Sequence, residues 1–174
     1  QYFEGIEKRD SLPKPKVVEK QTRPDVLLHY KKTDQMHFCL GVRAPDIFDK
    51  RKYALQIMAV ILGGNMSSRL FISVRERHGL AYYVNTTFEP TTDTGYLVTQ
   101  AGVKTNGFEK AIELVLKEYR DLKNKNISSQ ELQKAKDFLR GATALSLDAT
   151  DAKASFYAVQ EVLEGTMMTP EEKL

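Results

Sequence analysis

Apolar residues follow two different periods along this chain, and these periods predict its elements. Apolar and β-branched residues, in runs or in alternation, predict strands over 25–30, 36–45, 80–88 and 95–103. Apolar positions three and four residues apart predict helices over 52–62, 69–78, 108–122, from 129 toward 147, and over 152–163. This order favours an α+β fold, a two-layer sandwich in which helices cover one face of a mainly antiparallel sheet.

Residues with turn or cap chemistry separate these elements. Short polar stretches divide the first two strands and the last two, so each pair is expected to lie side by side, the last pair as a hairpin. Gly63-Gly64 follows the first predicted helix, where we expect a left-handed C-cap, and Gly79 and Gly165 end later helices. Ser128 with Glu131 three residues later is a capping box.

The two ends of the chain point to a larger protein. Residues 1–24 are polar, hold three prolines and carry charges of both signs, so we expect a linker or a first strand arriving from an upstream domain. Residues 25–174 are then expected to form one domain. Thr169-Pro170 is a helix start only a few residues before Leu174, so we expect this domain to be truncated at its C-terminus.

Composition and charge narrow the range of functions. With 174 residues, 41% hydrophobic and 28% charged, the chain has the composition of one globular domain. Its net charge of +3 is dispersed, which argues against a nucleic-acid partner. No apolar run approaches the roughly 18 residues of a membrane span. The first residues lack the pattern of a signal peptide, which says little about location. We expect a cytoplasmic protein, with the periplasm and the mitochondrial matrix as alternatives.

Cysteine and histidine are too few to build a site by themselves. Cys39 is the single cysteine, which excludes an internal disulfide. The three histidines, His29, His37 and His78, never fall at metal-ligand spacing. We therefore expect this chain to hold no metal and no cofactor of its own.

The segment 75–83 concentrates hydrogen-bond donors where a helix ends and a strand begins. Such junctions present side chains to clefts. Arg75 is a permanently charged planar donor, and Tyr82 offers a phenolic hydroxyl that can donate to a developing oxyanion. The alternative is a surface arginine and a core tyrosine, and residue types alone favour that alternative.

A longer string of residues changes this balance. The string comprises Ile61-Leu62-Gly63-Gly64-Asn65-Met66-Ser67-Ser68-Arg69-Leu70-Phe71, Val74-Arg75-Glu76-Arg77-His78-Gly79-Leu80-Ala81-Tyr82 and Asp93-Thr94-Gly95. It closely resembles the C-terminal, zinc-free half-domain of the pitrilysin and mitochondrial-processing-peptidase family, the inverzincins. Weaker matches extend the resemblance over roughly residues 25–165. Asn65 stands where the family commonly has a third glycine, and Asn tolerates the left-handed region.

The resemblance implies a role that this chain performs only with a partner. In the family, the N-terminal half carries a His-x-x-Glu-His helix that binds zinc. The half resembled here supplies an Arg and a Tyr seven positions apart that contact peptide substrate and stabilise the tetrahedral intermediate, and Arg75 and Tyr82 match that spacing. This sequence has no His-x-x-Glu-His. It is therefore expected to be inactive alone, and to work with its own N-terminal half-domain or a zinc-bearing partner subunit.

Two other functions stay open at this point. Some members of the family have lost catalysis and serve as structural or regulatory subunits, which would leave Tyr82 as a packing residue. A peptide-binding module that captures extended chains at an exposed sheet edge is a further alternative. A homo-oligomer is an alternative to pairing with a catalytic half.

Overall fold

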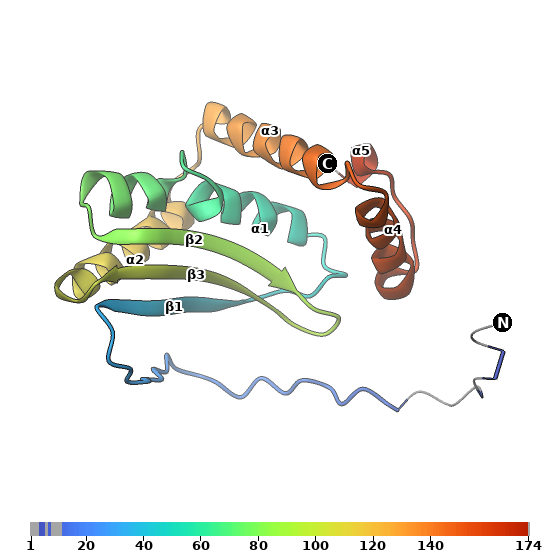
Figure 1. Ribbon diagram of the computed structural model, residues 1–174, viewed down its shortest axis with the longest axis horizontal. Helices are drawn as coiled ribbons and strands as arrows, with labels where there is room; N and C mark the ends of the chain where they lie inside the picture. Colours follow the sequence, from blue (N-terminus) through green and yellow to red (C-terminus); the bar gives the residue numbers. More distant parts are fainter. Residues whose placement is uncertain (1–3, 6, 8–11, 174) are drawn as a thin grey trace.

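Three long strands form one antiparallel sheet at the base of the molecule (Figure 1). The computed structural model describes residues 4, 5, 7 and 12–173; the remaining parts of the expected linker 1–24 lie outside the described residues. The strands are β1 (Gln35–Ala44), β2 (Ala81–Pro90) and β3 (Gly95–Lys104), in the order β1-β3-β2. β2 and β3 form the predicted hairpin, closed by a bond of 2.8 Å from the Thr91 amide to the Thr94 carbonyl.

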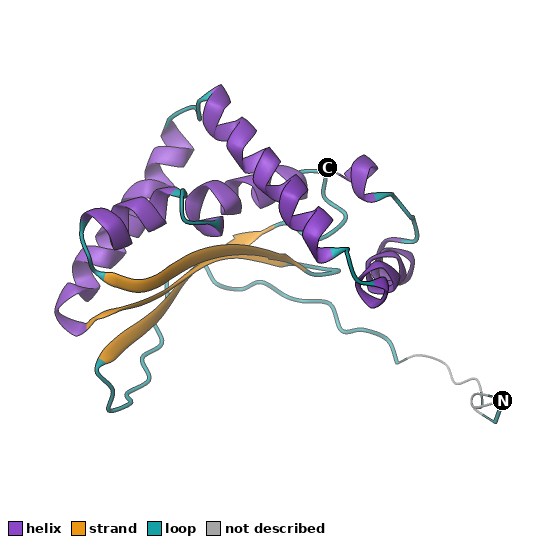
Figure 2. Ribbon diagram, turned by 45° about the horizontal axis from the view of Figure 1, so that its top comes forward, coloured by secondary structure: helices purple, strands orange, loops and turns teal. Residues whose placement is uncertain are grey.

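Helices cover one face of this sheet, and none of the described helices lies on the other, bare face, so the predicted α+β sandwich is confirmed (Figure 2). α1 (Lys52–Ala59) widens into a π-type turn, η1 (Val60–Gly64), and a second π-type helix, η2 (Phe71–Arg77), precedes β2. A short 3-10 turn, η3 (Thr105–Gly107), leads from β3 into the remaining helices. These are α2 (Phe108–Asn124), α3 (Ser129–Ser146), α4 (Thr150–Glu164) and α5 (Pro170–Lys173). No helix in the described part of the chain is long and apolar enough to cross a membrane.

The core lies between the sheet and the helices. β3 is the central strand and contributes the most deeply buried side chains of the sheet, which meet apolar residues of η1, η2 and α2; the cluster includes Leu62, Leu70, Val74, Leu97, Ala101, Val103, Ala111 and Val115. A series of three hydrogen-bonded hydroxyl groups crosses this core. The hydroxyls of Thr86 and Thr99 are 2.7 Å apart, and that of Thr99 is 2.9 Å from the Tyr119 hydroxyl, so each of these three hydroxyls has a partner.

The strand predicted over 25–30 is wrong. Residues 12–34 have no strand, and the side chains of Val26, Leu27, Leu28 and Tyr30 are 77–98% exposed. Upstream, residues 14–21 touch the β2–β3 turn and the end of β1. Lys14 pairs with Asp93 of the turn at 2.9 Å, and Arg43 Nη2 of β1 donates to the Gln21 carbonyl at 2.8 Å. A run of strand-forming residues becomes a strand only when a hydrogen-bonded neighbour is present, and none of the described residues supplies one.

The left-handed cap predicted at Gly63-Gly64 is also wrong. Gly63 has φ −157°, and the described glycines with positive φ are Gly79 and Gly165, so neither Gly63 nor Gly64 lies in the left-handed region. Gly63 is required for another reason: a Cβ there would lie 2.5 Å from the amide nitrogen of Thr86 on β2. The glycine permits close approach of a helix end to the sheet. The predicted stops at Gly79 (φ 60°) and Gly165 (φ 65°) are confirmed as left-handed residues.

Candidate functional site

Arg75 sits on the last turn of η2 and faces solvent. Its guanidinium carbon lies 4.9 Å from the centre of the Phe71 ring, one helical turn earlier, in a cation–π contact. Arg75 forms no ion pair with a carboxylate among the described residues. Its charge is therefore held in place by its own helix and is available to a partner or ligand.

A tight turn carries the chain from η2 into β2. The Gly79 amide donates to the Arg75 carbonyl at 3.1 Å, and the Leu80 amide donates to the Val74 carbonyl at 3.0 Å. His78 Nδ1 lies 2.6 Å from the Ser73 carbonyl and donates to it, which satisfies one more carbonyl of the helix end. Gly79 takes the left-handed conformation that the reversal needs. Arg75 and Tyr82 therefore flank one compact turn.

Tyr82 occupies an irregularity of β2. Ala81 pairs with Val103 and Tyr83 pairs with Gly102, so one residue of β3 is passed while β2 advances by two. Tyr82 is the extra residue of this β-bulge. Its side chain is 49% exposed, and it makes no hydrogen bond to any other described residue. Bulges commonly turn a side chain away from the direction that a regular strand would give it.

The bulge is what keeps Tyr82 out of the core. Leu80 packs against the core, and Val84 and Thr86 are buried on the helix-covered side of the sheet. Because alternate residues of a regular strand share a face, an unbroken strand from Leu80 to Val84 would also bury Tyr82. The inserted residue shifts this alternation, so that Ala81 packs against the core instead. The alternative of a core tyrosine, favoured by residue types alone, is therefore wrong.

Comparison with known proteins identifies the family of this chain. Residues 1–139 match the family model described as the peptidase M16 inactive domain. The chain belongs to the peptidase M16 inactive-domain family. It is 36% identical over 171 residues to the uncharacterized zinc protease YmxG of Bacillus subtilis, an alignment that covers 98% of this chain and 40% of that protein. The chain therefore spans about 40% of the length of that relative.

Two further relatives show the range of the family. The crystal structure of a peptidase M16 inactive domain from Pseudomonas fluorescens is 26% identical, with a TM-score of 0.63 over 81% of this chain and 37% of that one. The probable inactive metalloprotease YmfF of Bacillus subtilis is 25% identical over 156 residues, which cover 89% of this chain and 36% of that protein. The resemblance to a zinc-free half-domain is confirmed, and this M16 domain is the non-catalytic half of zinc-protease-like proteins.

The residues of this M16 domain do not fit a zinc site. In the described part of the chain, no three His, Cys, Asp or Glu side chains gather closely enough to hold a metal ion. His78 is engaged by the Ser73 carbonyl at 2.6 Å, and His37 is engaged by the Tyr83 hydroxyl at 3.1 Å. His29 lies in the exposed segment before β1. His37 and His78 therefore serve local structure.

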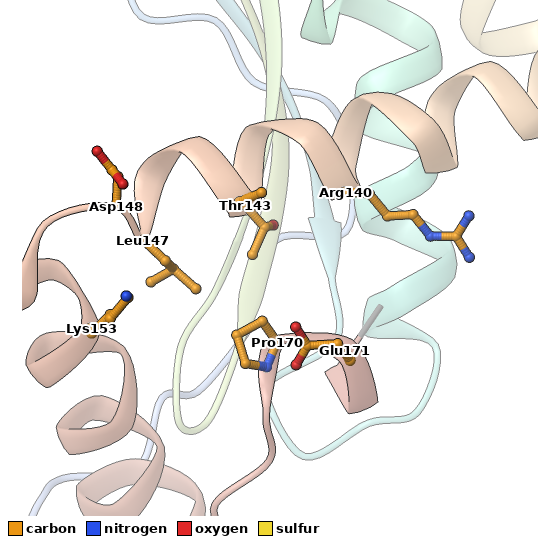
Figure 3. A pocket seen from close by; sticks show the side chains of 8 residues that line it. Arg140, Thr143, Leu147, Asp148, Lys153, Pro170 and Glu171 are labelled. Atoms are coloured by element: carbon orange, nitrogen blue, oxygen red, sulfur yellow. The ribbon is translucent and has the colours of Figure 1, made fainter.

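A surface pocket of about 600 Å³ lies away from Arg75 and Tyr82. Figure 3 shows it between the end of α3, the start of α4 and α5, with Arg140 and Thr143 above Pro170 and Glu171. Figure 1 places α4 and α5 at the end of the sheet opposite to the start of β2. Two cations, Arg140 and Lys153, and two carboxylates, Asp148 and Glu171, line the pocket. In Figure 3 neither the cations nor the carboxylates converge on one point, so the pocket is not part of the candidate site.

Sequence reasoning named Arg75 and Tyr82 as the candidate residues and missed what positions Tyr82. The spacing of seven identified Arg75 and Tyr82 through the family resemblance. The bulge at Tyr82 and the contact of Tyr83 with His37 were not foreseen, because both depend on how three strands align. Adjacent tyrosines with Gly102 opposite them were the available signal, since a glycine inside a strand often marks a bulge or a close approach.

Proposed function

We propose that this chain is the substrate-binding and oxyanion-stabilising half of a zinc-dependent endopeptidase. The catalytic half, with its His-x-x-Glu-His motif and its zinc, is either joined to this chain or carried by a partner subunit, and this chain alone is inactive. Peptide substrate lies between the two halves. The observation that carries the proposal is the bulge that exposes the Tyr82 phenol with no partner in the described structure.

Tyr82 is suited to the role of oxyanion donor. Attack on a peptide carbonyl turns its oxygen into an oxyanion, and a fixed O–H donor that meets this charge lowers the barrier. The Tyr82 hydroxyl is free of intramolecular hydrogen bonds among the described residues, so it loses no internal bond when it donates. A strand holds the backbone on both sides of the tyrosine, which favours a fixed donor over a mobile one.

Arg75 is suited to hold the substrate backbone. Its planar guanidinium presents several donors to carbonyl oxygens, and stacking on Phe71 limits its rotamers before substrate arrives. No carboxylate in the described part of the chain neutralises it. We assign Arg75 the role of holding a backbone carbonyl of the substrate or of orienting Tyr82, which lies on the other side of the turn.

Replacing the phenol tests the role of Tyr82. In the protein that carries this chain together with its catalytic half, Tyr82→Phe is expected to lower kcat by about 10²–10³, because one oxyanion donor is lost. Zinc content and the thermal unfolding midpoint are expected to stay unchanged. The matched control is Tyr96→Phe, which removes the hydroxyl of another tyrosine of the same sheet, 48% exposed. Full kcat in Tyr82→Phe would contradict the proposal.

Removing the guanidinium tests the role of Arg75. Arg75→Ala is expected to lower kcat and raise KM together, since its contacts exist in the bound ground state as well as in the transition state. Steady-state kinetics on a peptide series measures both constants. Arg77→Ala is the control, because Arg77 is exposed on the same turn of η2. Equal effects of the two variants would indicate a general charge effect and reject a specific role for Arg75.

A second candidate is a non-catalytic structural or regulatory subunit, or a peptide-binding module, of the same fold. It is favoured by the similarity to YmfF, which is described as a "probable inactive metalloprotease". The discriminating observation is whether the gene that encodes this chain, or its partner subunit, also encodes His-x-x-Glu-His. Its absence from both would favour this second candidate.

A further inference from the structure

A row of three residues crosses the bare face of the sheet beside Tyr82. His37 on β1 and Tyr83 on β2 both pair with Gly102 of the central strand β3. The Tyr83 ring spans the gap: its hydroxyl is hydrogen-bonded to His37 Nδ1 at 3.1 Å, and the two ring centres are 5.9 Å apart with their planes 28° from parallel. One side chain of β2 is thus joined to β1 across the strand between them.

Gly102 makes room for this bridge. A Cβ at that position would lie 2.5 Å from Cε1 and 3.0 Å from Cδ1 of Tyr83, and 3.1 Å from His37 Nδ1. The first distance is shorter than real Cβ contacts and the other two are tighter than most of them, so the tyrosine ring lies directly on the backbone of β3. The residue opposite Tyr83 must therefore be a glycine for the ring to reach His37.

The row also fixes the position of the bulge. Tyr83 is the first regularly paired residue after the irregularity, and Tyr82 is the residue just before it. If β2 slipped by one residue, the bulge would move and Tyr82 would take the core-facing direction that Leu80 and Val84 share. Such a slip would pull the Tyr83 ring off Gly102 and break its bond to His37.

We propose that His37, Tyr83 and Gly102 form a positioning lock that holds the β2 bulge in register and aims the Tyr82 phenol out of the core. The lock rests on the proposed function, because it matters for activity only if Tyr82 donates to the substrate. Tyr83 and His37 are positioning residues, and neither touches the reacting peptide in this proposal. Their effect reaches the reaction only through the direction of Tyr82.

Truncating Tyr83 tests the lock without adding a clash. In the protein that carries this chain together with its catalytic half, Tyr83→Ala is expected to lower kcat about 10- to 100-fold, since a misplacement of about 1 Å costs this much. KM is expected to change less than about threefold, because Arg75 and the substrate surface are untouched. Tyr83→Phe keeps the ring on Gly102 but removes the hydroxyl that bonds His37, so it is expected to restore kcat only in part. Asn85→Ala is the control, because Asn85 is exposed two residues further along β2 and outside the row.

A direct probe of Tyr82 separates the lock from the proposed function. With a fluorine on the Tyr82 ring, ¹⁹F NMR should give one resonance that moves or broadens in Tyr83→Ala and stays in place in Asn85→Ala. An unmoved resonance in Tyr83→Ala would overturn the lock. A displaced resonance with unchanged kcat would support the lock and overturn the role of Tyr82 in the reaction. Gly102→Ala, if it folds, should displace the resonance as Tyr83→Ala does, whereas Gly41→Ala should not, since a Cβ there meets only contacts of 3.8–3.9 Å.

Discussion

Replacing Glu131 with Gln is expected to lower the free energy of unfolding by about 1.5–3 kcal/mol at pH 7, the range measured for hydrogen bonds to charged groups. Glu131 lies at the start of α3, and its carboxylate accepts two bonds from Arg69, from Nε at 2.6 Å and from Nη2 at 2.7 Å. The two side chains are only 29% and 22% exposed, and Glu118 of α2 approaches Arg69 to 3.9 Å. Arg69, which lies between η1 and η2, is therefore tied to α3 by a bidentate, partly buried pair and approached by Glu118 of α2.

The pH dependence follows from the pKa of Glu131. The hydrogen bonds from Arg69 lower this pKa below its ordinary value of 4.5, although burial opposes them. A carboxyl with a lowered pKa stabilises the folded state above that ordinary value, and the stabilisation is lost as the pH falls through the lower, folded-state pKa. Because Gln does not titrate, the difference between the wild type and Glu131→Gln should shrink between pH 6 and pH 3.

Urea unfolding followed by circular dichroism measures this difference at each pH. The matched control is Glu113→Gln, whose carboxylate pairs with Lys110 at 3.0 Å on the surface of α2, with both side chains more than half exposed. That pair is expected to contribute about 0.5 kcal/mol or less. If Glu131→Gln destabilises no more than the control, or if the difference does not shrink as the pH falls below 4.5, the argument from the Arg69 pair is wrong.

Three further outcomes are expected. Gly63→Ala should destabilise the fold by about 1–3 kcal/mol through the clash with the β2 backbone, whereas Gly141→Ala, with open space around it on α3, should stabilise it by about 0.5–1 kcal/mol, both by urea unfolding. Thr99→Val should cost about 1–3 kcal/mol in the same assay, because Thr86 and Tyr119 lose their shared partner. Metal analysis of the chelator-washed chain should find no stoichiometric zinc, since no three ligands lie together among the described residues.

Elements whose signals are local were predictable from the sequence. The helix predicted over 108–122 is α2, and the hairpin of β2 and β3 has its turn where the polar residues indicated it. At the start of α3, the Ser128 hydroxyl accepts the Glu131 amide at 3.1 Å, as a capping box requires. The second arm of that box is replaced, because the Glu131 side chain bonds Arg69 instead. A charged partner from a distant helix outweighed the local acceptor role.

Elements whose form depends on a distant neighbour were not predictable. The segment 25–30 has the residues of a strand and no neighbour to pair with in the described structure. Glycine often ends a helix, but at Gly63 the backbone conformation is determined by the close approach of β2. In both cases the sequence pattern is real, and the tertiary contact decides the conformation that it takes.

The two residues of the candidate site differ in the same way. The Arg75 side chain is positioned by Phe71, four residues away on one helix, so its placement follows from local sequence. Tyr82 is positioned by the alignment of three strands, and no window around it contains His37 or Gly102. A segment 71–83 moved into another sheet would therefore keep the contact of Arg75 and lose the direction of Tyr82. Loss of kcat without loss of substrate binding is thus the expected signature of damage to β1 or β3, whereas damage to η2 should weaken both.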